Sequence, residues 1–211
     1  MMIDELNIRE KYTAQDFYQY FKPMAITEKQ KETRTETAND LWYVFLMLFV
    51  LISQGTENAD LDYMFILQEF RQMFSDTVSQ YARMDDYINE YIETFTTETL
   101  DTTWKHMDLG NPDDYWLSDE RAGLLALNES NTVNNYEDLQ KAIENGYTHK
   151  TWKAEMDSRT RKTHSKMDGK KIEIDKYFEF PDCKMIAPHD TLNGSNKELC
   201  NCRCSCVYTK E

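Results

Sequence analysis

The sequence predicts an α+β protein, with a mostly helical N-terminal region followed by a small C-terminal domain of one long helix, a short helix and a few short strands. Three observations predict this class. Apolar side chains recur at helical spacing in long segments before residue 110. After Gly146 the apolar period changes to 2, which is typical of strands. All five cysteines lie beyond residue 180. We place the two domains at residues 1–116 and 117–211.

Composition limits the function classes. A chain of 211 residues that is 40% hydrophobic can bury one large core or two small ones. Its net charge of −14 disfavours nonspecific nucleic-acid binding, because phosphate is repelled. The region from Lys150 to Lys176 is the local basic exception, and its basic side chains are interpreted as one solvated face: Arg159, Lys162, Lys166, Lys170 and Lys171.

Two capped helices are predicted at the start of the chain. Thr13 and Asp16 have the spacing of a capped start for a short helix that ends near Lys22. Thr27 and Gln30 form a better capping box, which opens a long helix reaching Ile52. The apolar run 41–52 is too short to cross a bilayer, so we expect a buried helix and no membrane partner. The charged N-terminus lacks the apolar region of a signal peptide.

Three further helices follow. Apolar stripes predict helices over about 60–83 and from about Asp85 to shortly before Gly110, with their aromatic and Met residues in a core. Ser118 is placed to cap a fourth helix that runs through Ile143, and Gly146 fits the C′ position after it. Nothing before residue 110 indicates catalysis.

The last sixty residues predict short strands around a short helix. Alternation over 151–156 predicts a strand, after which Asp157 is expected to cap a short helix that carries Arg161, His164 and Asp168 on one face. A turn at Gly169, a strand near 172–174 and a closing strand over 199–208 complete the domain. In such a closing strand the cysteines at 200, 202, 204 and 206 would share one face.

The residues from Trp152 onward form an ordered set: a Trp, D-x-R-x-R-x-x-H, a D-G turn, an aromatic residue, a Pro followed by an Asp, and a closing N-C-R-C. The positions are Trp152, Asp157, Arg159, Arg161, His164, Asp168, Gly169, Phe178, Pro188, Asp190, Asn201, Cys202, Arg203 and Cys204. This pattern resembles the C-terminal domain of phage minor head proteins, the family of Mu F and the SPP1 minor capsid protein. Glu129 would match the acidic position of that family, although Leu127 and Asn128 depart from its usual Arg-Thr.

The resemblance implies a phage minor capsid or head morphogenesis protein without enzymatic activity. It implies association with the portal protein and other head proteins during head assembly, DNA packaging or delivery, with only indirect contact with packaged DNA. The expected location is the virion, and the host cytoplasm during assembly. Cys183, Cys200 and Cys206 are additions to the family's pair of cysteines.

Two interpretations of the cysteines stay open. His164, Cys202 and Cys204 could bind one structural zinc ion, with Cys183, Cys200 or Asp157 completing a tetrahedron. Alternatively there is no cofactor, and a cysteine-rich strand packs on the core beside a hydrogen-bonded His164.

An alternative function uses the same residues. In a small nuclease or transferase, His164 would act as a general base and Arg159 and Arg161 would stabilise an anion, with or without zinc. The structural interpretation, which we favour, is an ion-pair network. In it Asp157 caps the helix, Arg161 reaches Asp157 or the last strand, and His164 bonds Asp168.

Overall fold

The computed structural model describes residues 12–57, 63–108 and 115–211. The chain forms two compact units, each with its own core. The first unit holds the described residues up to Phe17 and from Glu36 to Ala126, and the second holds Tyr18–Thr35 and Leu127–Glu211. These units divide the chain at Ala126 and add residues 18–35 to the C-terminal part, whereas the sequence analysis placed one boundary at 116. That earlier boundary stays a prediction.

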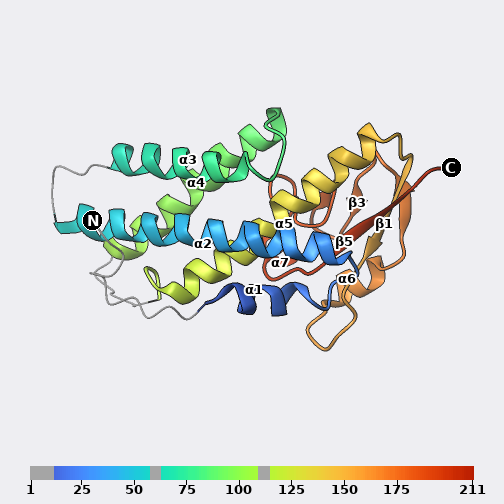
Figure 1. Ribbon diagram of the computed structural model, residues 1–211, viewed down its shortest axis with the longest axis horizontal. Helices are drawn as coiled ribbons and strands as arrows, with labels where there is room; N and C mark the ends of the chain where they lie inside the picture. Colours follow the sequence, from blue (N-terminus) through green and yellow to red (C-terminus); the bar gives the residue numbers. More distant parts are fainter. Residues whose placement is uncertain (1–11, 58–62, 109–114) are drawn as a thin grey trace. The chain divides into compact units, whose positions relative to one another are not determined.

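Long helices dominate, and the described strands are short and antiparallel, which confirms the α+β class (Figure 1). The helices are α1 (Ala14–Phe21), α2 (Glu28–Glu57), α3 (Tyr63–Val78), α4 (Asp86–Asp108), α5 (Asp119–Glu144), α6 (Lys162–Met167) and α7 (Asn196–Leu199). The strands are β1 (His149–Lys153), β2 (Lys171–Glu173), β3 (Phe178–Glu179), β4 (Lys184–Met185) and β5 (Ser205–Thr209). Part of the predicted start of the 60–83 helix lies outside the described residues, and α3 ends at Val78, earlier than expected.

The caps predicted for the long helices α2 and α5 are present. Thr27 and Gln30 form a reciprocal capping box at the start of α2, with hydrogen bonds of 3.0 and 3.3 Å. The Ser118 Oγ accepts the Arg121 N–H at the start of α5. At its other end Gly146 has φ +71°, and the backbone N–H groups of residues 146 and 147 donate to the carbonyls of residues 143 and 142. This is a Schellman ending, which glycine permits without a Cβ penalty.

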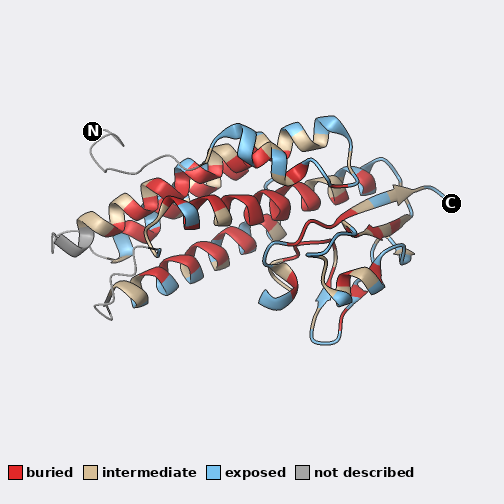
Figure 2. Cartoon of the chain, turned by 90° about the horizontal axis from the view of Figure 1, so that it is seen from below, coloured by how far each residue is buried: buried red, intermediate tan, exposed pale blue. Residues whose placement is uncertain are grey.

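The first unit has an aromatic core between α2, α3 and α4. Phe45 contacts Phe70, Phe74 and Phe95, with ring centroids 6.0–6.1 Å apart. Helices α3 and α4 lie side by side (Figure 1). Figure 2 shows buried positions running along the long helices. Phe74, Val78 and Tyr91 are buried in this core as their helical spacing predicted. Met64 and Phe65, on the same predicted stripe, are 64% and 45% exposed, so the prediction of a core position was wrong for these two residues.

Helix α2 is long and apolar enough over Glu28–Gln54 to cross a membrane, judged by length and composition alone. Its apolar window has a mean hydropathy of 1.3, and 56% of that window is buried inside the protein. Leu41, Phe45 and Leu48 are fully buried in the first unit. The apolar stretch is thus a core helix, as the sequence analysis expected.

The second unit contains a three-stranded antiparallel sheet in the order β2-β1-β5 and a β3–β4 hairpin. Trp152 on β1 pairs with Cys206 on β5. A buried hydrophobic cluster forms the core of this part of the unit. Four partly buried residues pack against it: Ile172, Cys183, Leu199 and Cys206. The buried members are Trp152, Ala154, Met167, Phe178, Phe180, Met185, Cys202 and Cys204.

Three local predictions were wrong. The strand predicted over 151–156 is β1, which covers His149–Lys153 and ends before Met156, a residue that is 61% exposed. The closing strand begins at Ser205, because residues 196–199 form α7 and Asn201 bends the chain with φ +55°. The cysteines at 200–206 therefore do not share one strand face. Asp157 does not cap α6, which begins at Lys162 after Arg161. Instead the Asp157 carboxylate accepts the backbone N–H of Arg159 at 2.9 Å, which closes a local turn.

Candidate functional site

The candidate site lies where α6 meets the segment between α7 and β5, within the second unit. Helix α6 presents His164 inward, and the bend at Asn201 turns Cys202 and Cys204 toward it. All three side chains are only 2% exposed. The fold therefore brings together residues that are 38 and 40 positions apart in sequence.

Three potential metal ligands converge in this buried space. The His164 Nδ1 lies 3.3 Å from the Cys204 Sγ and 3.6 Å from the Cys202 Sγ. The three donor atoms all lie within 4.8 Å of one another. The rings of Trp152 and Phe180 pack edge-on against the imidazole, with centroids 5.8 and 5.6 Å away. This shell keeps the group away from bulk water.

The second nitrogen of His164 faces an acidic residue that the sequence analysis missed. The Nε2 lies 2.8 Å from the Glu198 Oε2, in ion-pair range, although the N–H direction is not aligned as a hydrogen bond. Thr163 donates its hydroxyl to the same Glu198 oxygen at 2.8 Å. Glu198 is 5% exposed. A carboxylate buried against an imidazole favours a tautomer with the proton on Nε2 and a free lone pair on Nδ1.

The two sulfurs differ in acidity. Burial disfavours the Cys202 thiolate, but hydrogen bonding, chiefly from Cys204, outweighs that cost and holds the pKa of Cys202 well below its usual value. Hydrogen bonding to Cys202 and burial raise the pKa of Cys204 well above its usual value. The Cys204 backbone N–H also points to the Cys202 Sγ at 3.4 Å. Negative charge is therefore stabilised on Cys202.

A row of asparagines on α5, here called the asparagine ladder, holds the cysteine segment by its backbone. Asn128 accepts the Asn201 N–H at 2.7 Å. Asn131 donates to the Cys202 carbonyl at 3.2 Å, and Asn135 donates to the Cys204 carbonyl at 3.3 Å. Spacings of three and four residues put these amides on one helix face. That asparagine spacing in the sequence was the available signal, and the sequence analysis did not use it.

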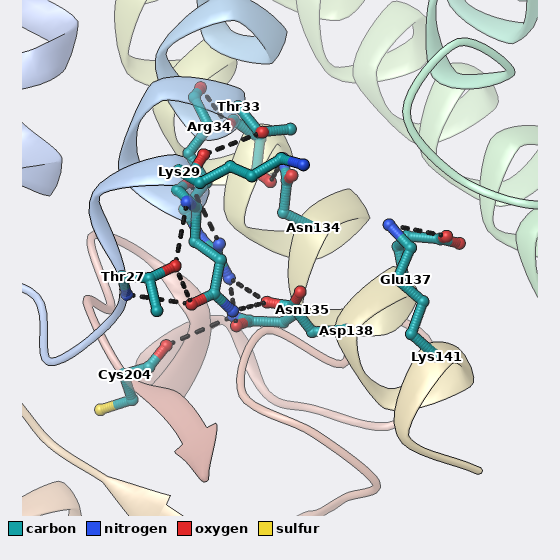
Figure 3. A network of polar contacts seen from close by, with 12 residues as sticks. Thr27, Lys29, Thr33, Arg34, Asn134, Asn135, Glu137, Asp138, Lys141 and Cys204 are labelled. Atoms are coloured by element: carbon teal, nitrogen blue, oxygen red, sulfur yellow. Dashed lines mark hydrogen bonds and ion pairs between the residues drawn. The ribbon is translucent and has the colours of Figure 1, made fainter. Parts of the chain in front are cut away.

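A buried arginine extends the ladder to the start of α2. Arg34 is 1% exposed and donates to the Asn135 Oδ1 at 2.9 Å and to the Asp138 Oδ2 at 3.0 Å. Gln30 donates to the same Asp138 oxygen at 2.9 Å. Figure 3 shows Arg34 reaching toward Asn135 and Asp138, with the Cys204 carbonyl on the other side of Asn135. Residues 18–35 are thereby attached to the unit that contains the site.

The three arginines of the motif are each engaged in a hydrogen bond or an ion pair. Arg203 is 7% exposed and donates to the Asp157 Oδ2 at 2.6 Å. Arg161 donates to the Cys200 carbonyl instead of pairing with Asp157. Arg159 is exposed and lies 3.7 Å from the Asp157 carboxylate. Arg159 and Arg203 thus approach the same Asp157 oxygen, and all three arginines line the small cavity beside His164.

The remaining motif residues shape the backbone. The Asp168 Oδ1 accepts the Ala154 N–H at 3.0 Å, so the expected bond from His164 to the Asp168 side chain is not formed. Gly169 adopts φ +76° in the turn into β2. Buried Asp190 follows Pro188, which is also buried, and accepts the backbone N–H groups of residues 186 and 193.

Glu129, the match to the family's acidic position, lies in the interior. It is 7% exposed and accepts the Thr132 hydroxyl at 3.2 Å. Thr132 in turn lies 3.1 Å from the Thr191 hydroxyl, in the loop that follows Asp190. Glu129 thus belongs to the buried polar face of α5 rather than to an open surface.

The other cysteines named as candidate ligands lie elsewhere. Cys200 is exposed, and Cys183 lies in the β3–β4 turn. Among the described residues, the grouped metal donors contain neither of them. Asp157 is engaged by Arg203. The structure therefore brings together three of the five cysteine and histidine positions proposed from the sequence.

A small cavity of about 20 Å³ adjoins His164, Cys202 and Cys204. It has room for about one water molecule, since a water needs roughly 10–15 Å³ of accessible space. Its other lining residues are Glu155, Arg159, Thr160, Arg161, Asn201 and Arg203. A nucleotide or a sugar does not fit into this space.

Comparison with known proteins adds one finding. A family model described as "Phage Mu protein F like protein" matches residues 78–207, which is more than half of the chain. Comparison with curated proteins gave no match, and comparison with solved structures gave none. The matched range includes every motif residue from Trp152 to Cys204.

Proposed function

Since this chain belongs to the phage Mu protein F like family of phage head proteins, we propose that it is a non-enzymatic minor capsid protein that associates with the portal and the procapsid. It acts there in head assembly, DNA packaging or delivery. The observation that carries this proposal is the family match across residues 78–207.

The burial and the hydrogen bonds of the motif residues support a structural role for these side chains. Trp152 is fully buried in the core, and Asp190 is 2% exposed and holds a turn. Arg203 is paired with Asp157, and Arg161 is bonded to a backbone carbonyl. Side chains that are occupied in this way hold the domain together. Partner recognition is then left to its exposed surface.

The size of the site supports the absence of enzymatic activity. A nuclease or a transferase needs an accessible general base. His164 is 2% exposed, and the cavity next to it has a volume of about 20 Å³. The rings of Trp152 and Phe180 also pack on the imidazole.

Charge supports head proteins, rather than DNA, as the direct partners. A net charge of −14 repels phosphate. Arg159, Lys162 and Lys166 are exposed, but Lys171 pairs with Glu211 and acidic residues lie nearby in sequence. Contact with packaged DNA is therefore indirect, through the portal and other head proteins.

The test uses procapsids from the phage context with a tagged copy of this chain. We expect the chain to co-purify with procapsids in few copies, and to be lost from procapsids that are assembled without portal protein. Retention without portal would overturn the portal association. Absence from all procapsids would overturn the head function itself.

A second assay addresses the enzyme alternative. The purified chain is incubated with linear and supercoiled DNA in the presence of Zn²⁺ or Mg²⁺, beside His164→Gln. We expect no cleavage by either protein. Cleavage by the wild-type chain that His164→Gln abolishes would replace the proposal with the nuclease alternative.

A further inference from the structure

The buried group of His164, Cys202 and Cys204 has the composition of a metal site rather than of an ordinary core. We propose that the His164 Nδ1 and the two sulfurs bind one structural zinc ion, and that Glu198 orients the imidazole from its far side. Imidazole and thiolate ligands suit zinc better than hard cations such as Mg²⁺ or Ca²⁺, which prefer oxygen. The inference does not depend on the association with the portal.

The distances fit tetrahedral coordination. With Zn–N near 2.0–2.1 Å and Zn–S near 2.3 Å, tetrahedral angles place the nitrogen and each sulfur about 3.6 Å apart. The observed Nδ1–Sγ distances are 3.6 Å for Cys202 and 3.3 Å for Cys204. To bind a zinc ion, the two Nδ1–Sγ distances would therefore have to change by no more than a few tenths of an ångström from the observed values.

The surroundings of the imidazole also match a zinc ligand. Zinc-binding histidines usually direct the other ring nitrogen to a carboxylate or a carbonyl, which fixes the tautomer. Here the Nε2 lies 2.8 Å from Glu198, and Thr163 holds the same carboxylate oxygen. Glu198 is 5% exposed, so an acid has been buried for this contact. A buried carboxylate needs such a partner, because desolvation of the charge is costly.

The surroundings of the two cysteines also suit zinc ligands. The Cys204 backbone N–H approaches the Cys202 Sγ at 3.4 Å, and a donor of this kind stabilises a thiolate. The asparagine ladder holds the carbonyls of both cysteines. If the group held no metal, both thiols and one imidazole nitrogen would have to satisfy one another in a dry core through weak S–H hydrogen bonds.

The fourth ligand comes from the small cavity. His164, Cys202 and Cys204 all line it, and its volume of about 20 Å³ accommodates one water molecule. A water ligand there would complete the tetrahedron. Because the cavity takes nothing larger, the ion serves the fold and ties α6 to the segment before β5.

The first experiment measures metal in the full chain, purified after expression with added Zn²⁺ and without chelator. We expect about one zinc per chain by elemental analysis. The double variant Cys202→Ser/Cys204→Ser should lose it, while the matched control Cys183→Ser/Cys200→Ser should keep it. Wild-type protein that is folded and free of zinc would overturn the proposal, as would loss of zinc from the control alone.

The second experiment avoids variants that fail to fold, since structural zinc often supports folding itself. Wild-type protein is stripped with a chelator and titrated with Co²⁺. The expected spectrum has the visible bands of tetrahedral cobalt and a sulfur-to-cobalt charge-transfer band that corresponds to two thiolates. A spectrum of octahedral cobalt, or one without the sulfur band, would contradict the assignment.

The role of Glu198 has its own readout. Glu198→Gln should weaken zinc binding by about 10–100-fold in competition with a chromophoric chelator. Glu179→Gln, at an exposed position on β3, is the matched control and should leave the affinity unchanged. Equal zinc affinities for the two variants would remove Glu198 from the site.

Discussion

Arg203 donates to the Asp157 carboxylate over 2.6 Å, and this pair ties the segment before β5 to the turn before α6. The two residues are 46 positions apart in sequence. The Arg203 side chain is 6% exposed and that of Asp157 is 34% exposed, so the guanidinium depends on this partner more than the carboxylate does. Loss of Asp157 would leave a buried positive charge without its acidic partner.

Asp157→Asn should lower the melting temperature at neutral pH. The size of this decrease should become smaller as the pH falls. The hydrogen bond from Arg203 is the main cause that lowers the pKa of Asp157 to about 2 from its usual 3.8. A lowered carboxyl pKa stabilises the fold above the usual value, and this stabilisation is lost as the pH falls toward 2. Thermal unfolding should therefore show that the difference in melting temperature between wild type and variant decreases from pH 5 to pH 2. A gap that stays constant over this range would contradict the assignment.

Asp182→Asn serves as the control for that experiment. Asp182 pairs with Lys197, whose side chain is 81% exposed, over 3.3 Å. An exposed pair of this kind contributes little, so the control should unfold close to the wild type at pH 5.

Arg34→Met should destabilise the second unit by about 2–4 kcal/mol, because it leaves Asn135 and Asp138 without their buried donor. Arg34 is 1% exposed, and Asp138 keeps 22% exposure, which moderates the loss. Urea unfolding measures the change. Lys31→Met is the matched control on the same helix, since Lys31 pairs with the largely exposed Glu28. If the two variants are equally stable, the buried network contributes nothing.

Asn131→Asp tests the asparagine ladder. Asn131 is fully buried and donates to the Cys202 carbonyl at 3.2 Å, whereas an aspartate would present only acceptors to that carbonyl. We expect a loss of about 1–3 kcal/mol in the free energy of unfolding. Asn145→Asp, at an exposed position just after the end of α5, should change stability by less than about 1 kcal/mol. Similar losses for both variants would argue against the ladder.

Lys150→Met tests a buried lysine of β1 by its pH dependence. The Lys150 side chain is fully buried and donates to the carbonyls of Ile174 and Ile186 at 2.8 and 2.6 Å. Burial lowers its pKa to about 8 from 10.5. Between these values the unfolded chain binds a proton that the folded chain has lost, so this residue makes stability rise with pH.

We expect the free energy of unfolding of the wild type, relative to that of Lys150→Met, to increase from pH 7.5 to pH 10. Chemical unfolding at both pH values measures it. Lys166→Met, at an exposed position on α6, controls for the loss of one positive charge. A difference that does not change with pH would show that Lys150 remains charged in the fold.

Local chemistry made much of the fold predictable. The capping box of Thr27 and Gln30, the Ser118 cap and the glycine ending at Gly146 each involve residues no more than five positions apart. Such contacts form within one helical turn, and their residue types are legible in sequence. The pattern from Trp152 to Cys204 likewise pointed to the family that the chain was found to belong to.

The candidate site was only partly predictable. His164, Cys202 and Cys204 were named from their chemistry, and the fold brings them together. The regular strand assumed over 199–208 was wrong, because an alternating pattern cannot reveal that Asn201 adopts a positive φ. That bend, rather than strand alternation, is what turns Cys202 and Cys204 inward and leaves Cys200 exposed.

The sequence by itself determined where α2 and α5 begin and where α5 ends, which family the chain belongs to, and which side chains could bind a metal. Only the tertiary structure decided their partners: Glu198 for His164, Arg203 for Asp157, and the α5 asparagines for the cysteine backbone. The physical reason is sequence separation. A cap is decided within a turn of helix, whereas a buried polar group takes whichever partner the packing of distant segments places within about 3 Å.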